Sequence, residues 1–399
     1  MERTRLEQWI CETEGLPELT REALEQLQLR RLNGLLARMH ERNPRYPVQL
    51  SSLSELQNLP FTTPEMLSAH PGRFLATSQS EIQRVISGAT SGTTGPAKRV
   101  FYTAADTAHT VGFFTAGISE MLSAGEKCLI AFPFTGPFGL GDLIAQAVER
   151  LGGIPVRAGF GQSWQDLMDL VRETQAETYI GFPVMLLGLA RLYGGGFPIR
   201  RALVSGDACP AGVMEALELQ LGSRLYPHYG CRECGLGGAV TCQAFEGMHL
   251  RENHILAEIV DDAGKPVPDG QYGELVITTI GMEAMPLLRY RTGDDTRFLP
   301  PCPCGGVTKR LDVVSRRERG PLSIEELDSL LFRVPELVDY AAYWDGRLHI
   351  RASAWTDISE EIHNLIYVNF KMDAEVLSIQ TDWTDRPMYL GKRFLKRSP

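Results

Sequence analysis

The sequence has no apolar stretch that approaches the roughly 20 residues of a membrane-spanning helix. Its opening segment, MERTRLEQWICETEG, is charged throughout and lacks the apolar core of a secretory signal. Basic residues are in the minority, because 40 Lys and Arg face 49 Asp and Glu for a net charge of −9. These absences predict a cytoplasmic protein that works neither in a membrane nor as a general nucleic-acid binder.

Cysteine is also scarce, with eight residues in a chain of 399. That number is too small for a disulfide-stabilised scaffold, and clustered cysteines in a reducing compartment indicate metal binding or catalysis instead. The hydrophobic share of 43% excludes a disordered chain. Because a single core stops growing at roughly 250–300 residues, we expect one large domain and one small domain.

Sequence patterns predict an α/β fold. Residues 1–80 have apolar positions at helical spacing. Over about 127–228, short apolar runs alternate with stretches long enough for helices, which favours βαβ units and a parallel sheet. From about 255, strand-and-turn patterns favour antiparallel hairpins. We expect a large N-terminal domain over 1–315, whose first 80 residues are helical, and a small α+β domain over 316–399.

The segment 87–100, SGATSGTTGPAKRV, combines three glycines, five hydroxyl side chains and a lysine. Glycines let successive backbone N–H groups turn toward one anion, while hydroxyls add donors and the lysine adds charge. A flexible Gly/Ser linker is the alternative. The segment fits neither G-x-x-x-x-G-K-[ST] nor G-x-G-x-x-G. The pattern therefore predicts a phosphate-binding loop that is neither a Walker nor a Rossmann site.

Several motifs together resemble one enzyme superfamily. The run Thr90–Gly95, followed by Pro-Ala-Lys, resembles the phosphate-binding signature of the adenylate-forming acyl- and aryl-CoA ligases. LPFTT at 59–63, EAMPLLRYRTGD at 283–294 and PCPCG at 301–305 resemble the phenylacetate-CoA ligase branch. Several motifs in the expected order are more specific than any one of them.

The resemblance runs in order over about 60–315 and weakens after that. It implies a large adenylate-forming domain with a shortened C-terminal lid domain. It also implies an AMP-forming acid–thiol ligase that uses ATP and Mg²⁺ to activate an aryl or acyl carboxylic acid and then transfers the acyl group to CoA. The substrates would be that acid and CoA; whether the chain forms a homodimer is left open by the sequence.

The resemblance also implies site residues in the N-terminal part. Tyr229 and Gly230 begin a Y-G-x-x-E element in which the ring stacks near adenine and Glu233 binds Mg²⁺. The loop that covers the β- and γ-phosphates would comprise Ser91, Gly92, Thr93, Thr94, Gly95 and Lys98.

Asp294 matches an aspartate that accepts hydrogen bonds from the ribose hydroxyls, a role that suits a carboxylate. Gly206 and Asp207 match a segment that runs beside the adenine. Taken singly, such residues are also typical of turns and surface carboxylates, but the ordered set favours the functional interpretation. FPFTGPFG at 132–139 fits an acyl-pocket wall and core packing equally well.

Two thiols in Cys302-Pro-Cys304 are close enough in sequence to bind one metal ion. Cys242 and His249 are their best partners, because the resembled family carries a similar Cys and His before the corresponding strand. Cys₃His is an ordinary structural zinc set, so we expect Zn²⁺ here.

A second cysteine pair, Cys231 and Cys234, has CxxC spacing. This spacing is compatible with a ligand pair, with a redox couple or with free structural thiols. The residue between them, Glu233, is already assigned to Mg²⁺ by the resemblance.

The C-terminal part departs from the family pattern. Arg317 stands where the family has a basic residue near its hinge, but the longer Gly-rich loop of the thioester-forming site is missing. Lys392, in Leu-Gly-Lys-Arg, resembles the lysine that reaches the substrate carboxylate and α-phosphate, and it also fits an ordinary basic tail. The expected catalytic residues are thus Glu233, Arg317 and Lys392. Two alternatives stay open: a non-CoA acceptor, or a catalytically silent nucleotide-binding regulatory relative.

Overall fold

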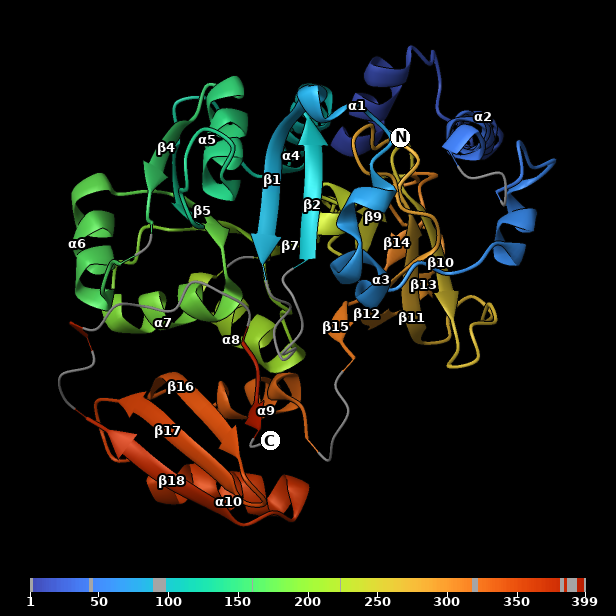
Figure 1. The fold of residues 1–399 in the computed structure, drawn as a ribbon. Coiled ribbons are helices and arrows are strands. Elements are labelled where there is room, and N and C mark those ends of the chain that lie inside the picture. The colour runs from blue at the N-terminus through green and yellow to red at the C-terminus, as the bar shows by residue number, and fades with distance from the viewer. Residues whose placement is uncertain are drawn as a thin grey trace. The chain divides into compact units, whose positions relative to one another are not determined.

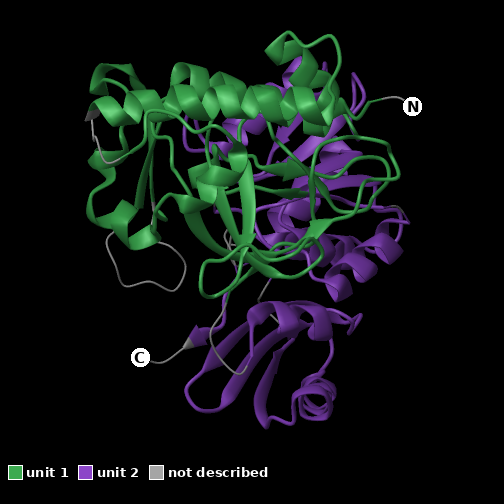
Figure 2. Cartoon of the chain, turned by 90° about the vertical axis from the view of Figure 1, so that its right-hand side faces the viewer, with its two compact units in different colours: residues 1–120, 228–317 green, residues 121–227, 318–399 purple. Residues whose placement is uncertain are grey.

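The computed structural model describes residues 3–42, 46–88, 98–159, 161–222, 224–317, 322–380, 384–385 and 393–397. The chain forms two compact units, each built from two separate segments (Figure 2). Unit 1 comprises residues 1–120 and 228–317, and unit 2 comprises residues 121–227 and 318–399. The boundary expected at 315/316 stays a prediction.

Up to Glu81, the helices and 3₁₀ turns described in unit 1 agree with the helical character expected of residues 1–80 (Figure 1). Helix α1 begins after Thr4, whose hydroxyl accepts a hydrogen bond from the N–H of Glu7, and ends at Gly15 in the left-handed conformation (φ 64°). The helices of unit 1 are α1 (Arg5–Glu14), α2 (Arg21–Arg42), α3 (Pro64–Ala69) and α4 (Ala104–Ile118), with 3₁₀ turns η1 (Leu53–Asn58), η2 (Pro71–Phe74), η3 (Gln79–Glu81) and η4 (Arg232–Cys234).

The strands of unit 1 pair antiparallel, as the patterns after residue 255 predicted. The strands are β1 (Ile82–Gly88), β2 (Lys98–Thr103), β8 (Ala239–Val240), β9 (Met248–Leu250), β10 (Leu256–Val260), β11 (Gly273–Thr278), β12 (Tyr290–Thr296), β13 (Phe298–Leu299), β14 (Arg310–Leu311) and β15 (Ser315–Arg316). Strands β1 and β2 form a hairpin in which Gly88 is the register partner of Lys98. A second sheet has the order β10-β11-β12-β15, and the short strands follow the order β13-β14-β9-β8.

Residues 121–227 of unit 2 form the parallel βαβ array that the sequence predicted. The elements are β3 (Lys127–Ala131), α5 (Leu140–Arg150), β4 (Ile154–Arg157), α6 (Trp164–Thr174), β5 (Thr178–Gly181), α7 (Pro183–Tyr193), β6 (Arg201–Val204), α8 (Ala211–Leu221) and β7 (Tyr226–Tyr229). Their strand order is β4-β3-β5-β6-β7. The last two residues of β7 belong to unit 1, where β7 pairs antiparallel with β8.

The C-terminal segment of unit 2 is α+β, also as expected. Its elements are α9 (Ile324–Leu331), β16 (Leu337–Trp344), β17 (Leu348–Ala354), α10 (Ser359–Phe370), β18 (Ala374–Ile379) and β19 (Lys396–Arg397), with sheet order β18-β17-β16-β19. One hydrophobic core spans both segments of the unit, so that Val213 and Leu217 of α8 are buried with Leu327 and Leu331 of α9. Unit 2 therefore folds around residues from both segments.

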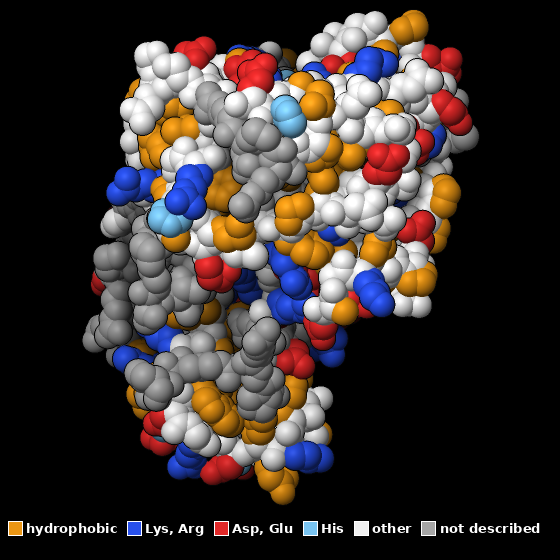
Figure 3. Space-filling view, turned by 45° about the vertical axis from the view of Figure 1, so that its right-hand side comes forward, with side chains coloured by type: hydrophobic (Ala, Val, Ile, Leu, Met, Phe, Trp, Pro, Cys, Tyr) orange, Lys and Arg blue, Asp and Glu red, His pale blue; other side chains and the backbone are white. Residues whose placement is uncertain are grey.

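No helix among the described residues combines the length and the apolar character that crossing a bilayer requires. On the face drawn in Figure 3, acidic and basic side chains are interspersed.

Candidate active site and metal centre

Three buried side chains of unit 1 form a closed hydrogen-bonded triangle. Lys98 at the start of β2 donates to Glu233 Oε1 at 2.5 Å and to the Tyr290 hydroxyl at 2.8 Å, and Tyr290 donates to the same Oε1 at 3.0 Å. All three side chains are buried. Burial opposes ionisation of Glu233, but the charge and hydrogen bond of Lys98 outweigh it and lower the pKa of this carboxyl. Glu233 is therefore an ionised carboxylate held next to a cation.

This hydrogen-bonded triangle involves two residues with expected roles, Lys98 and Glu233. Lys98 was expected to bind phosphate, whereas here its ammonium group lies on the carboxylate that was expected to bind Mg²⁺. A single protein carboxylate suits Mg²⁺ when substrate phosphates supply other ligands. Glu233 fits that requirement if the ammonium group of Lys98 moves away from the Oε1 atom of Glu233.

A second cluster lies farther along β12. Tyr229 at the end of β7 donates its hydroxyl to Asp294 Oδ2 at 2.9 Å, and Arg316 of β15 donates to Asp294 Oδ1 at 2.9 Å. Asp294 and Tyr229 are both buried, and burial raises the pKa of Tyr229 well above its usual value. Both oxygens of Asp294 thus have donors, so that ribose hydroxyls would replace or share these partners.

Arg316 is a residue that the sequence interpretation missed. It is the register partner of Asp294 across β12 and β15. Its neighbour Arg317, the expected hinge residue, instead forms ion pairs with three other carboxylates, those of Asp262, Asp295 and Glu274. Arg316 is the last residue of β15, so the pairing of β15 with β12 sets it opposite Asp294, whereas Arg317 follows the strand. The strand register was the missing signal.

The turn that carries Glu233 depends on a glycine and on two thiols. A Cβ at Gly230 would lie 2.0 Å from the carbonyl oxygen of Leu236, so no other residue fits without a backbone shift. The N–H of Cys231 donates to Cys234 Sγ at 3.2 Å, and Cys234 Sγ donates to the Cys231 carbonyl at 3.2 Å. Both cysteines are free thiols that stabilise this turn.

Gly206 and Asp207 follow β6 in unit 2. Gly206 has a φ of +85°. A Cβ atom at this position would lie 2.8 Å from the ring of Phe132 and 2.7 Å from the ring of Phe182, so a side chain does not fit here. Phe132 is buried against Phe182, which favours core packing over an exposed pocket wall for this residue. Asp207 accepts hydrogen bonds from two backbone N–H groups, those of Ala208 and Arg393.

Two sets of expected residues lie outside the described part of the chain. These are the loop residues Ser91, Gly92, Thr93, Thr94 and Gly95, and the C-terminal Lys392. The loop joins two described residues, Gly88 and Lys98, that are partners in the β1–β2 hairpin.

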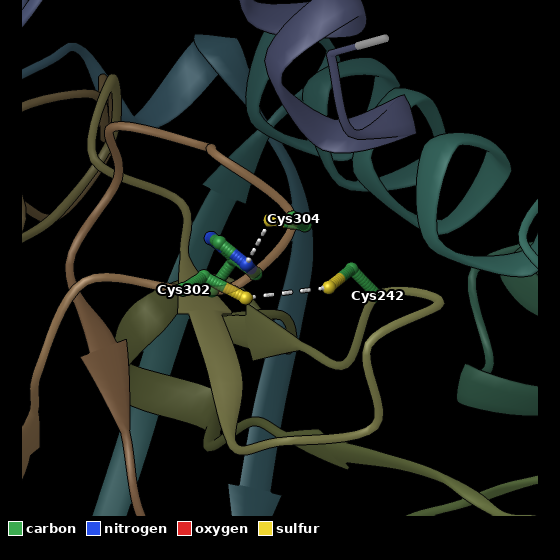
Figure 4. A group of neighbouring side chains, drawn as sticks. Cys242, Cys302 and Cys304 are labelled. Carbon is green, nitrogen blue, oxygen red and sulfur yellow. Dashed lines mark hydrogen bonds between the residues drawn. The ribbon is translucent and has the colours of Figure 1, made fainter. Parts of the chain in front are cut away.

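The expected metal ligands meet in unit 1 (Figure 4). The four side chains are Cys242, His249, Cys302 and Cys304, and their ligand atoms all lie within 4.8 Å of one another. Cys242 Sγ is 3.8 Å from Cys302 Sγ, and Cys304 Sγ is 3.4 Å from His249 Nε2. A tetrahedral ion with Zn–S bonds of about 2.3 Å would hold its sulfur ligands about 3.8 Å apart. The donor set and its spacing fit a Cys₃His metal site.

Further contacts orient these ligands. His249 Nδ1 lies 2.8 Å from the Thr308 hydroxyl, which donates in turn to Glu7 Oε1 at 3.0 Å. Glu7 lies in α1 and also accepts the N–H groups of Val307 and Thr308. Burial lowers the pKa of His249 to about 4, so its imidazole is neutral and its Nε2 can act as a ligand. The N-terminal helix thereby supports the centre.

The chain is similar to proteins of known family. A family model described as "AMP-binding enzyme" matches residues 89–284. The phenylacetate-coenzyme A ligase of Thermus thermophilus is 31% identical over 363 residues, which cover 82% of this chain and 79% of that protein. The chain belongs to the adenylate-forming AMP-binding enzymes. The family resemblance of its motifs is thus confirmed.

Other adenylate-forming enzymes extend the comparison. The phenylacetate-coenzyme A ligase of Pseudomonas putida is 29% identical, with 82% of this chain and 80% of that protein covered. A crystal structure of 2-hydroxyisobutyryl-CoA ligase in the postadenylation state matches with a TM-score of 0.75 at 20% identity, covering 92% of this chain and 88% of that one. This likeness confirms the α/β fold, including the C-terminal α+β segment.

Proposed function

We propose that this protein is an AMP-forming acid–CoA ligase of the phenylacetate-CoA ligase type. The observation that carries the proposal lies within one unit of an adenylate-forming enzyme. There an ionised Glu233 beside Lys98 is grouped with the buried pair of Tyr229 on β7 and Asp294 on β12. Its substrates are ATP, a carboxylic acid of the aryl or acyl class, and CoA, and its place of action is the cytoplasm.

The proposed reaction has two steps. A carboxylate oxygen of the acid attacks the α-phosphorus of ATP and pyrophosphate leaves; the CoA sulfur then attacks the acyl carbon and AMP leaves. Glu233 would hold Mg²⁺, which neutralises phosphate charge, and Lys98 and the loop at 91–95 would bind the phosphates. Asp294 would bind the ribose, and Lys392 would stabilise the charge that develops in the first step.

Pyrophosphate release tests the proposal. Purified protein is assayed with ATP, Mg²⁺ and a panel of aryl and aliphatic acids, with and without CoA. Glu233→Ala should reduce turnover by at least about 10²-fold because the metal carboxylate is lost, whereas Glu149→Ala, at an exposed position of α5, should leave it unchanged.

The other outcomes separate the alternatives. Accumulation of a stable acyl-adenylate that added CoA does not consume would show that the acyl group is transferred to an acceptor other than CoA. Nucleotide binding without pyrophosphate release for any acid would contradict the enzymatic proposal and favour a regulatory relative.

We also propose that the Cys₃His group binds structural Zn²⁺. The support is its three thiols, its neutral imidazole and sulfur spacing close to that of a tetrahedral site. Four protein ligands leave no open position for a substrate, so the ion would serve to fix the loop between β13 and β14.

A further inference from the structure

Two side chains form a hydrogen-bonded relay from His249, in the Cys₃His group, to helix α1 at the N-terminus. His249 Nδ1 lies 2.8 Å from the Thr308 hydroxyl, and this hydroxyl donates to Glu7 Oε1 at 3.0 Å. The same oxygen accepts the backbone N–H groups of Val307 at 2.6 Å and of Thr308 at 2.9 Å. The side chains of His249, Thr308 and Glu7 are all buried. Three donors thus converge on one oxygen of a residue in α1.

The hydrogen atoms of this relay can be placed by counting donors and acceptors. A threonine hydroxyl has a single hydrogen, and Thr308 donates it to Glu7. The hydroxyl oxygen can therefore only accept from His249, so Nδ1 of the ring carries a hydrogen. In a neutral imidazole the other nitrogen, Nε2, then carries the lone pair. Nε2 lies 3.4 Å from Cys304 Sγ, within the Cys₃His group. The relay thus favours the tautomer that can bind a metal ion.

The start of α1 also contacts the segment that carries another member of the group, Cys242. Glu120 Oε1 accepts the backbone N–H of Arg5 at 3.2 Å, and Glu120 Oε2 accepts the side-chain amide of Gln243 at 3.1 Å. Gln243 directly follows Cys242 in the sequence. Two carboxylates, those of Glu7 and Glu120, therefore join α1 to the segments that carry the metal ligands.

We propose that Thr308 and Glu7 are positioning residues of the metal centre. They hold His249 in its metal-binding tautomer, and in this way they couple metal binding to the docking of α1 on the rest of unit 1. Because such coupling is reciprocal, zinc stabilises the docked helix by the same factor by which the docked helix stabilises bound zinc. The inference rests on the proposal of structural Zn²⁺ made above, and it adds an energetic role for residues 5–14.

The simpler alternative is that Glu7 only anchors the backbone of the β13–β14 loop. Its contacts with the N–H groups of Val307 and Thr308 serve that purpose without the threonine hydroxyl. Thr308→Val removes the hydroxyl, keeps both backbone N–H groups and has a side chain of similar shape. Thr308→Ser keeps the hydroxyl. Comparison of these two variants therefore separates the relay from the backbone anchor.

Zinc affinity is measured by competition with a chromophoric chelator. Thr308→Val should weaken zinc binding by about 10- to 100-fold, the usual effect of losing the hydrogen-bond partner of a metal-bound histidine, and Thr308→Ser should stay within about threefold of the wild type. Glu7→Ala leaves the hydroxyl without its acceptor and should weaken binding at least as much as Thr308→Val.

Thr62→Val is the matched control for Thr308→Val. Both threonines are 4% exposed, and the Thr62 hydroxyl donates to the carbonyl of Leu288 at 2.7 Å, outside the metal centre. Zinc affinity should therefore be unchanged in Thr62→Val. An equal loss of affinity in the two variants would assign the effect to lost stability and overturn the relay.

Hydrogen exchange in the wild type tests the coupling without any substitution. Removal of zinc with a chelator should speed amide exchange in residues 5–14, because the helix loses a stabilising partner. Equal exchange with and without zinc would overturn the coupling. A wild type that binds zinc together with an unaffected Thr308→Val rejects the inference alone, whereas a wild type that binds no zinc rejects the zinc proposal and the inference with it.

Discussion

Glu233 illustrates how a sequence motif can single out a residue without indicating its hydrogen-bond partners. The Y-G-x-x-E motif marked it as an expected metal ligand, a role that stays a prediction, and the structure shows it as a buried carboxylate whose pKa is lowered by Lys98. Nothing in the sequence indicated that Lys98 and Tyr290 would both hydrogen-bond to it. These contacts join residues 57 and 135 positions away, and such pairings follow from the fold and not from a local pattern.

Substitution of Arg316 tests whether the Asp294 cluster binds the nucleotide. Arg316→Ala removes the charged donor on Asp294 Oδ1, so that among the described residues the buried carboxylate keeps the Tyr229 hydroxyl at its other oxygen. Charged hydrogen bonds contribute about 1.5–3 kcal/mol, so we expect the KM for ATP to rise about tenfold or more. Steady-state kinetics with varied ATP measure this.

Arg297→Ala is the matched control for that experiment. It removes another arginine–aspartate pair, between Arg297 and Asp312, in which the arginine side chain is 38% exposed and accessible to solvent. Exposed pairs contribute little, typically below about 1 kcal/mol. An equal effect of the two variants would show that Arg316 has no particular role in binding the nucleotide.

At the scale of elements, the sequence predicted the metal centre better than the nucleotide site. Few residue types bind zinc, so the family resemblance and the chemistry of thiols and imidazole together grouped Cys242, His249, Cys302 and Cys304, and the structure brings these side chains together. The support from α1 could not be predicted in this way, because a glutamate that accepts backbone N–H groups has no distinctive sequence pattern. The sequence did not indicate the β12–β15 register either, since SRRER at 315–319 offers three arginines, at 316, 317 and 319.

Metal removal tests the centre. Purified protein should contain about one zinc ion per chain, and Cys302→Ser should lose most of it, because three ligands bind far more weakly than four. We expect chelation to lower the Tm and to expose the β13–β14 loop to proteases. Cys209→Ala, which removes a buried thiol outside the cluster, is the control for metal content. Full zinc content in Cys302→Ser would contradict the assignment.

At the scale of the whole molecule, segments that lie far apart in the sequence pack into one hydrophobic core within unit 2. The parallel array over 121–227 and the α+β segment after 318 were both predicted from periodicity, but their common core was not. Helices α8 and α9 approach each other at Gly212, where a Cβ would lie 1.9 Å from the Ser329 carbonyl oxygen. Only the folded structure shows that this glycine is needed for a contact between segments more than a hundred residues apart.

Gly212→Ala should therefore weaken the unit as a whole. Because the added methyl group meets backbone and not a movable side chain, we expect a loss of about 1–3 kcal/mol in the free energy of unfolding. Urea titration followed by circular dichroism measures the change. Gly34→Ala is the control, because an exposed helical glycine of α2 with open space around it should gain up to about 1 kcal/mol. Equal stability of Gly212→Ala and the wild type would mean that α8 and α9 separate readily.

The Cys₃His cluster in unit 1, proposed above to bind zinc, has a practical consequence as well. Cobalt(II) can replace zinc in such surroundings, and sulfur-to-cobalt charge transfer is strongly coloured. The protein would then carry its own optical reporter beside β14. Loss of this absorbance during denaturation would report when the β13–β14 loop releases the metal. Circular dichroism would report separately when the helices unfold.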